Sequence, residues 1–131
     1  MSSSSSSLFE DVCHNILDLD KTIRFAGIAS MRRTIVSSKY RARLVPLLTQ
    51  GETLESVEHS IIRMDTRRLI EAKLGKTIYS ITLYGKVKRA VIPIGKHGDF
   101  VLMVSFDNEA ADHDSIIRNK IMPLVSSHHQ I

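Results

Sequence analysis

The stretch that decides the fold reads TIYSITLY at residues 77–84, KVKRAVIPI at 86–94 and FVLMVSF at 100–106. Apolar and polar side chains alternate in the first of these segments, and Gly85 and the loop GKHGD at 95–99 separate the three. Period-two patterning between glycine-containing turns predicts three consecutive antiparallel strands. The third segment is apolar on both faces, so we expect it to lie in a sheet that is covered on both sides.

The rest of the chain adds helices and two further strands around this meander. Apolar residues at three- and four-residue spacing predict helices at 8–17, at 50–74 and from about 114. The second of these helices has a start signal in the capping-box spacing of Thr49 and Glu52, and Gly75 suits its end. Strands are predicted at 22–30 and 34–40, which gives an α+β domain in the order αββαβββα with an antiparallel sheet between helices.

Length and composition indicate one domain. The chain of 131 residues is predicted to form a single domain over 8–125, a disordered serine-rich tail over 1–7 and a flexible tail over 126–131. Cys13 is the only cysteine, so no intrachain disulfide forms and a reducing, cytoplasmic location is expected. No apolar run approaches the roughly 20 residues that span a bilayer, and a membrane is therefore not expected as a partner.

Charge is distributed unevenly along the sequence. Residues 21–96 hold sixteen Lys and Arg against five Asp and Glu, although the whole chain has a net charge of only +4. A basic middle permits binding to an acidic protein or to nucleic acid, or its charge is neutralised by the acidic ends within the fold or across a dimer. The residues expected on a basic partner-binding surface are Arg32, Arg33, Arg63, Arg67, Lys86 and Lys88.

No motif in the chain predicts catalysis or metal binding. Asp112, His113 and Asp114 form an acid and histidine cluster, but an aspartate there is better explained as a cap of the final helix. His128 and His129 are interpreted as tail residues, and the six histidines lack zinc-ligand spacing. We therefore expect no enzyme activity, no catalytic residue, no metal and no cofactor.

The segment at 78–83 carries no charged residue, in contrast to the lysines of the following strand. Lysine on an accessible strand discourages unwanted edge pairing, so an uncharged edge is open to a partner strand. An isologous homodimer with one continuous sheet is the simplest way to satisfy such an edge. The residues expected in this dimer interface are Ile78, Ser80, Ile81, Thr82 and Leu83.

The order of elements resembles the roadblock group of the profilin-like superfamily over residues 8–125. That resemblance implies a five-stranded antiparallel sheet with one long helix on one face and the terminal helices on the other. It also implies a central last strand and a third strand at the edge. The segments FAGIA (25–29), SKYR (38–41), LGK (74–76) and KVKRAVIP (86–93) are in addition similar to a small uncharacterised archaeal protein family, which implies no activity.

Roadblock resemblance implies a homodimeric, non-enzymatic regulatory or scaffolding module that binds a protein partner, with a small GTPase as one candidate. Two alternatives stay open. One is a nucleic-acid-binding accessory protein that uses the basic surface, although no ribonucleoprotein-type aromatic motif accompanies it. The other is a small-molecule sensor of PAS-like type with a pocket between the sheet and a helix.

Overall fold

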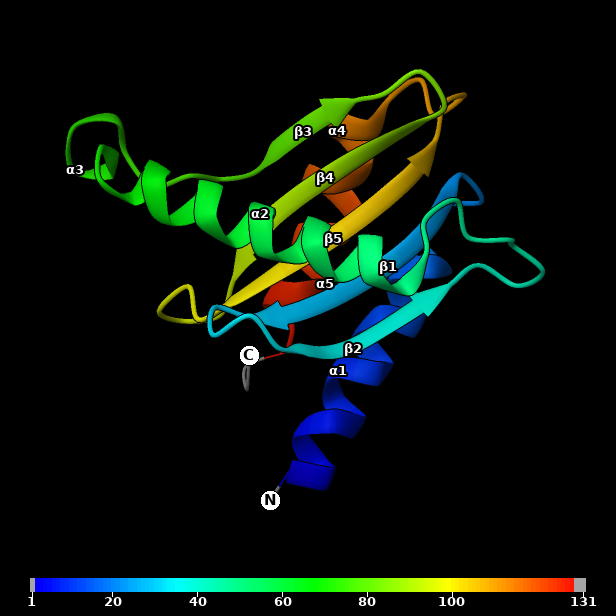
Figure 1. Ribbon diagram of the computed structural model, residues 1–131, viewed down its shortest axis with the longest axis horizontal. Helices are drawn as coiled ribbons and strands as arrows, with labels where there is room; N and C mark the ends of the chain where they lie inside the picture. The colour runs from blue at the N-terminus through cyan, green and yellow to red at the C-terminus, as the bar shows by residue number, and fades with distance from the viewer. Residues whose placement is uncertain (1, 129–131) are drawn as a thin grey trace.

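The computed structural model describes residues 2–128, and a five-stranded antiparallel sheet forms its middle layer. Its elements along the chain are α1 (Ser2–Leu17), β1 (Ile23–Ser30), β2 (Ile35–Tyr40), α2 (Gln50–Arg68), α3 (Glu71–Leu74), β3 (Ser80–Leu83), β4 (Val87–Ile94), β5 (Phe100–Asp107), α4 (His113–Ile116), the π-helical turn η1 (Ile117–Ile121) and α5 (Met122–Ser126). The strands are arranged in the order β2-β1-β5-β4-β3, so the predictions of a central last strand and of an edge position for the third strand are both confirmed. Helix α2 crosses one face of the sheet, and α1, α4 and α5 cover the other (Figure 1).

Strand β5 is apolar on both faces because it contributes to both halves of the core. Leu102 and Phe106 are fully buried beneath α1 and the C-terminal helical segments. Val101 and Met103 instead contact the α2 side, where Ile61 and its helical neighbours are buried. The alternation of side chains along one strand therefore supplies two separate hydrophobic layers.

Gly27 lies in the middle of β1 because the Phe25 ring occupies the space above it. A Cβ atom at Gly27 would lie 2.6 Å from a ring carbon of Phe25, closer than two such carbons approach. Phe25 in turn packs on Tyr40 of β2, with ring centroids 4.8 Å apart. The lack of a side chain at Gly27 therefore lets the Phe25 ring lie over this position of the strand.

Helix α2 begins as predicted and ends earlier than predicted. Thr49 and Glu52 form a capping box, with the Thr49 N–H donating to the Glu52 carboxylate at 2.9 Å and the Glu52 N–H donating to the Thr49 hydroxyl at 3.1 Å. The expected single helix over 50–74 is wrong, since α2 ends at Arg68 and a separate turn, α3, follows and is capped by Gly75. Met64 is the last buried residue of α2, so the helix has no hydrophobic contact to prolong it beyond the sheet.

Strand β3 is shorter than the predicted segment 77–84. The Tyr84 N–H donates to the Val87 carbonyl, and Ser80 pairs with Val91. Because hydrogen-bonded pairs recur every two residues in an antiparallel ladder, Ile78 would form the next such pair with Pro93. Proline has no N–H to donate. The ladder therefore stops at Ser80, and Ile78 lies just outside the strand.

The two chain ends also differ from expectation. Helix α1 starts at Ser2, so the serine run expected as a disordered tail over 1–7 is helical from residue 2, because a helix that has nucleated over its packed turns extends at one hydrogen bond per added residue. The final helix continues past Pro123 after the π turn η1, since a proline in the first turn of α5 removes no N–H that this turn needs. Of the tail expected over 126–131, Ser126 belongs to α5, and residues 129–131 lie outside the described residues.

Candidate protein-interaction surface

Strand β3 forms one of the two edges of the sheet, and β2 forms the other. Strand β3 pairs only with β4 among the described residues. Ser80 and Thr82 use their backbone groups toward β4, so the N–H and C=O groups of Ile81 and Leu83 point outward. Leu83 and Ile78 are 63% and 49% exposed, whereas Ile81 is half-buried against the core. Four of the five residues expected in a dimer interface therefore lie in this edge strand, and Ile78 lies two residues before it.

Helix α2 crosses one face of the sheet, shares a groove with the β3–β4 hairpin and is charge-polarised. Its first half carries Glu52, Glu55 and Glu58, and its second half carries Arg63, Arg67 and Arg68 against a single Asp65. Two copies of such a helix placed antiparallel bring acidic halves against basic halves. The charge pattern is therefore compatible with self-association next to the β3 edge.

The six residues expected on one basic surface are divided among separate places. Arg32 and Arg33 lie in the turn between β1 and β2, which is at the opposite end of the sheet from the β3–β4 hairpin that carries Lys86 (Figure 1). Lys88 is half-buried and donates to the Ala110 carbonyl at 2.5 Å, so its charge is used within the fold. Only Arg63 and Lys86 line the same cavity, and Arg67 is one helical turn beyond Arg63.

That cavity is an open groove between α2 and the β3–β4 hairpin, with a volume of about 520 Å³. Tyr84, Leu47 and Leu48 give it an apolar wall, and Arg89 adds a third strong cation to Arg63 and Lys86. Glu55 and Glu52 contribute acidic groups, and the Glu52 carboxylate is already used in the capping box. The groove matches the place expected for a sensor pocket between the sheet and a helix, but it is open and its charges are mixed.

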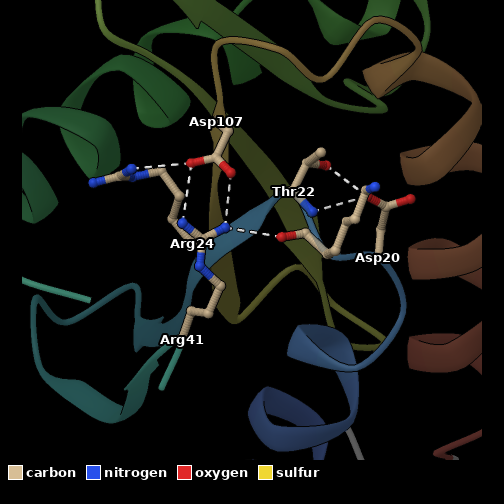
Figure 2. Close-up of polar contacts among 6 residues, drawn as sticks. Asp20, Thr22, Arg24, Arg41 and Asp107 are labelled. Carbon is tan, nitrogen blue, oxygen red and sulfur yellow. Dashed lines mark hydrogen bonds and ion pairs between the residues drawn. The ribbon is translucent and has the colours of Figure 1, made fainter. Parts of the chain in front are cut away.

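A cluster of ionised side chains that the sequence did not reveal ties three strands together (Figure 2). Arg41 donates to both carboxylate oxygens of Asp107, at 2.8 and 3.2 Å, and Arg24 donates to the same carboxylate at 3.0 Å. Arg41 also donates to the Lys21 carbonyl at 2.8 Å. Asp107 comes directly after the apolar run of β5, and this position is the only feature of the sequence that could have pointed to a role for it. The cluster holds the ends of β1 and β5 and the residue after β2 in register, which is a structural task.

The Arg24, Arg41 and Asp107 cluster sets the direction of the pH dependence of stability. Hydrogen bonds from the two arginines hold the pKa of Asp107 below its ordinary value, and hydrogen bonds from Thr22 do the same for the pKa of Asp20. A lowered folded-state pKa means that stabilisation is complete above the unfolded-state pKa of about 4 and is lost as the pH falls through the folded-state pKa. We expect the free energy of unfolding, measured by urea denaturation, to decline from about pH 4 downward. The Asp107→Asn variant should show a flatter profile in that range, and an equally steep profile would contradict this assignment.

The remaining polar candidates have structural roles. Asp112 caps α4 by accepting from the Ser115 N–H at 3.2 Å, as predicted, and Asp114 accepts from Tyr79 and from Arg118. Burial raises the pKa of the Cys13 thiol to about 11, which leaves it protonated and unreactive. Over residues 2–128 no group of three acidic, histidine or cysteine side chains could hold a metal ion, and His129 lies outside that range. No described helix is long and apolar enough to cross a membrane.

Comparison with known proteins identifies the fold. No protein-family model matches the sequence, and no curated protein sequence matches it either. Among solved structures, the chain is similar to MglB of Myxococcus xanthus, with a TM-score of 0.73 at 12% identity over 95% of this chain and 87% of that one. It is also similar to a roadblock/LC7 domain from Streptomyces avermitilis, with a TM-score of 0.69 at 12% identity over 90% and 92% of the two chains. A third similar structure is MglC of Myxococcus xanthus, with a TM-score of 0.57 at 8% identity over 97% and 99%. The chain therefore adopts the α+β fold of roadblock/LC7 domains, as its order of elements predicted.

Proposed function

We propose that this protein is a non-enzymatic homodimeric regulatory or scaffolding module that binds a protein partner. The observation that carries the proposal is the unpaired, uncharged β3 edge, on which Leu83 is 63% exposed. An exposed edge strand with free backbone groups and apolar side chains is a template for another strand. The charge polarity of α2, which shares a groove with the β3–β4 hairpin, supports pairing with a second copy, since acidic and basic halves face each other in an antiparallel arrangement.

The ladder geometry of β3 selects one register for the dimer. Ile81 and Leu83 carry the outward-facing backbone groups, so the pairing that satisfies them within β3 places Ile81 of one copy opposite Leu83 of the other. The two-fold axis then passes beside Thr82, and the two Thr82 residues form a non-hydrogen-bonded pair. The Cα atoms of such a pair lie about 4.5 Å apart, which suits a disulfide.

A cysteine substitution tests both the dimer and its register. Thr82→Cys is expected to give a disulfide-linked dimer under mild oxidation, detected by non-reducing electrophoresis. Ser38→Cys is the matched control, since it is an exposed residue on the β2 edge at the other side of the sheet. The native Cys13 is buried and does not compete. Equal crosslinking of the two variants, or none with Thr82→Cys, would contradict the proposed interface.

A small GTPase is the proposed class of protein partner. The support is the resemblance of the fold to roadblock domains, since fold analogy raises this candidate without assigning a contact surface. The test is a titration of a small GTPase from the same organism, loaded with GDP or with a non-hydrolysable GTP analogue, against the purified dimer by isothermal calorimetry. Binding in one nucleotide state supports a regulatory role, and binding in neither state contradicts it.

A further inference from the structure

The chain turns from α2 into β3 through a projecting corner, defined here as residues 67–78. Figure 1 shows α3 at the far left, beyond the margin of the sheet. No residue of α3 is buried, and Leu69 and Leu74 are 82% and 76% exposed. Ile70 and Ile78 are 53% and 49% exposed. Four large aliphatic side chains thus lie in water on a part of the molecule that covers no core.

The same corner is strongly basic. It contains Arg67, Arg68, Lys73 and Lys76 against Glu71, a net charge of +3 out of +4 for the whole chain. The Glu71 carboxylate accepts from the Thr77 N–H at 3.0 Å, so the only acid is held inside the turn. Arg68 donates to the Gly98 carbonyl. Among the described residues, Lys73 and Lys76 form no ion pair and stay available for an anionic surface.

We propose that the corner at residues 67–78 attaches the protein to the surface of a membrane rich in anionic lipids. Aliphatic side chains that project from the fold enter the boundary between headgroups and acyl chains, and neighbouring lysines and arginines contact anionic headgroups. No described helix could span a bilayer, and attachment to a membrane surface requires no spanning helix. A bilayer accepts a projecting shape without a matching pocket, whereas a protein partner would need an acidic hollow of the same form.

This attachment does not depend on the proposed dimer. Apart from Ile78, which borders β3 and is expected in the dimer interface, the corner lies outside β3, so a monomeric variant retains it. A two-fold axis perpendicular to the sheet would keep both corners on the α2 side, and a dimer would then bind more tightly through two contacts. A variant that cannot dimerise should bind vesicles more weakly but still bind them. A variant with an altered corner should lose vesicle binding and still dimerise.

The test is flotation of the full chain with vesicles of phosphatidylcholine alone or mixed with phosphatidylglycerol. We expect the protein to float with the anionic vesicles, less so as salt is raised, and to stay unbound with the neutral ones. The Leu69→Ser/Leu74→Ser variant should lower the partition coefficient by at least about tenfold, since two aliphatic side chains are lost. The Lys73→Gln/Lys76→Gln variant should lower it roughly 25-fold, since each lysine near an anionic surface contributes about a fivefold factor.

Val45→Ser is the matched control, because Val45 is 80% exposed and lies in the loop before α2, outside the corner. It should float like the wild type, and circular dichroism should show all variants folded. The proposal is overturned if the wild type does not float with anionic vesicles or if both double variants float unchanged. A change in dimer affinity in the leucine variant, with vesicle binding intact, would instead show that a second copy covers the corner.

Discussion

The Leu83→Lys variant is expected to be a folded monomer at concentrations where the wild type is a dimer. Leu83 is 63% exposed at the β3 edge, so its replacement leaves the core intact. In the proposed register its side chain lies against Ile81 of the partner, so the ammonium group would be desolvated against an apolar side chain. We expect the dimer to dissociate at least about 30-fold more readily, as for loss of a central interface residue. Analytical ultracentrifugation over a concentration series measures this change.

Val45→Lys is the control for a new lysine on an exposed apolar position, since Val45 is 80% exposed in the loop before α2. It should leave the dimer affinity unchanged. Ile81→Lys is a poorer probe, because Ile81 packs against the core and its loss would test folding instead. A Leu83→Lys variant that is folded and as dimeric as the wild type would refute an interface at this edge.

Removal of the Asp107 carboxylate by Asp107→Ala is expected to lower the free energy of unfolding by about 2 kcal/mol. The substitution deletes the acceptor of three hydrogen bonds from Arg24 and Arg41. It also leaves two guanidinium groups side by side, with side chains only 17% and 32% exposed. Loss of one partner from a fully buried pair costs more, about 3–5 kcal/mol, and partial solvent access reduces that cost here. Urea denaturation near pH 7 followed by circular dichroism measures the difference.

Asp11→Ala provides the matched comparison for the Asp107 variant. Asp11 is exposed on α1, so its removal should change the free energy of unfolding by less than about 0.5 kcal/mol. Equal free energies of unfolding for the Asp107→Ala and Asp11→Ala variants would show that the Asp107 cluster contributes no more to stability than a single exposed aspartate.

The sequence by itself determined the elements whose signals are local. The alternation at 77–106 predicts the meander, the Thr49 and Glu52 spacing predicts the start of α2, and the doubly apolar run at 100–106 predicts a strand covered on both faces. Each of these signals depends on neighbouring residues, because hydrophobic periodicity and capping act within a few positions of the chain. The uncharged edge at Ile78–Leu83 was recognisable for the same reason, since it is a contiguous segment.

Only the tertiary structure decided features that join distant residues. The Asp107 cluster links positions 66 and 83 residues apart. Lys88 was expected on the surface but reaches the Ala110 carbonyl, and the other basic residues are spread over both ends of the sheet. Helix α2 ends at Arg68 because the sheet surface beneath it ends there. The β3 ladder stops at Ser80 because Pro93 lies opposite Ile78. Cross-strand register and the extent of a neighbouring surface are set by packing between segments, and no local pattern encodes them.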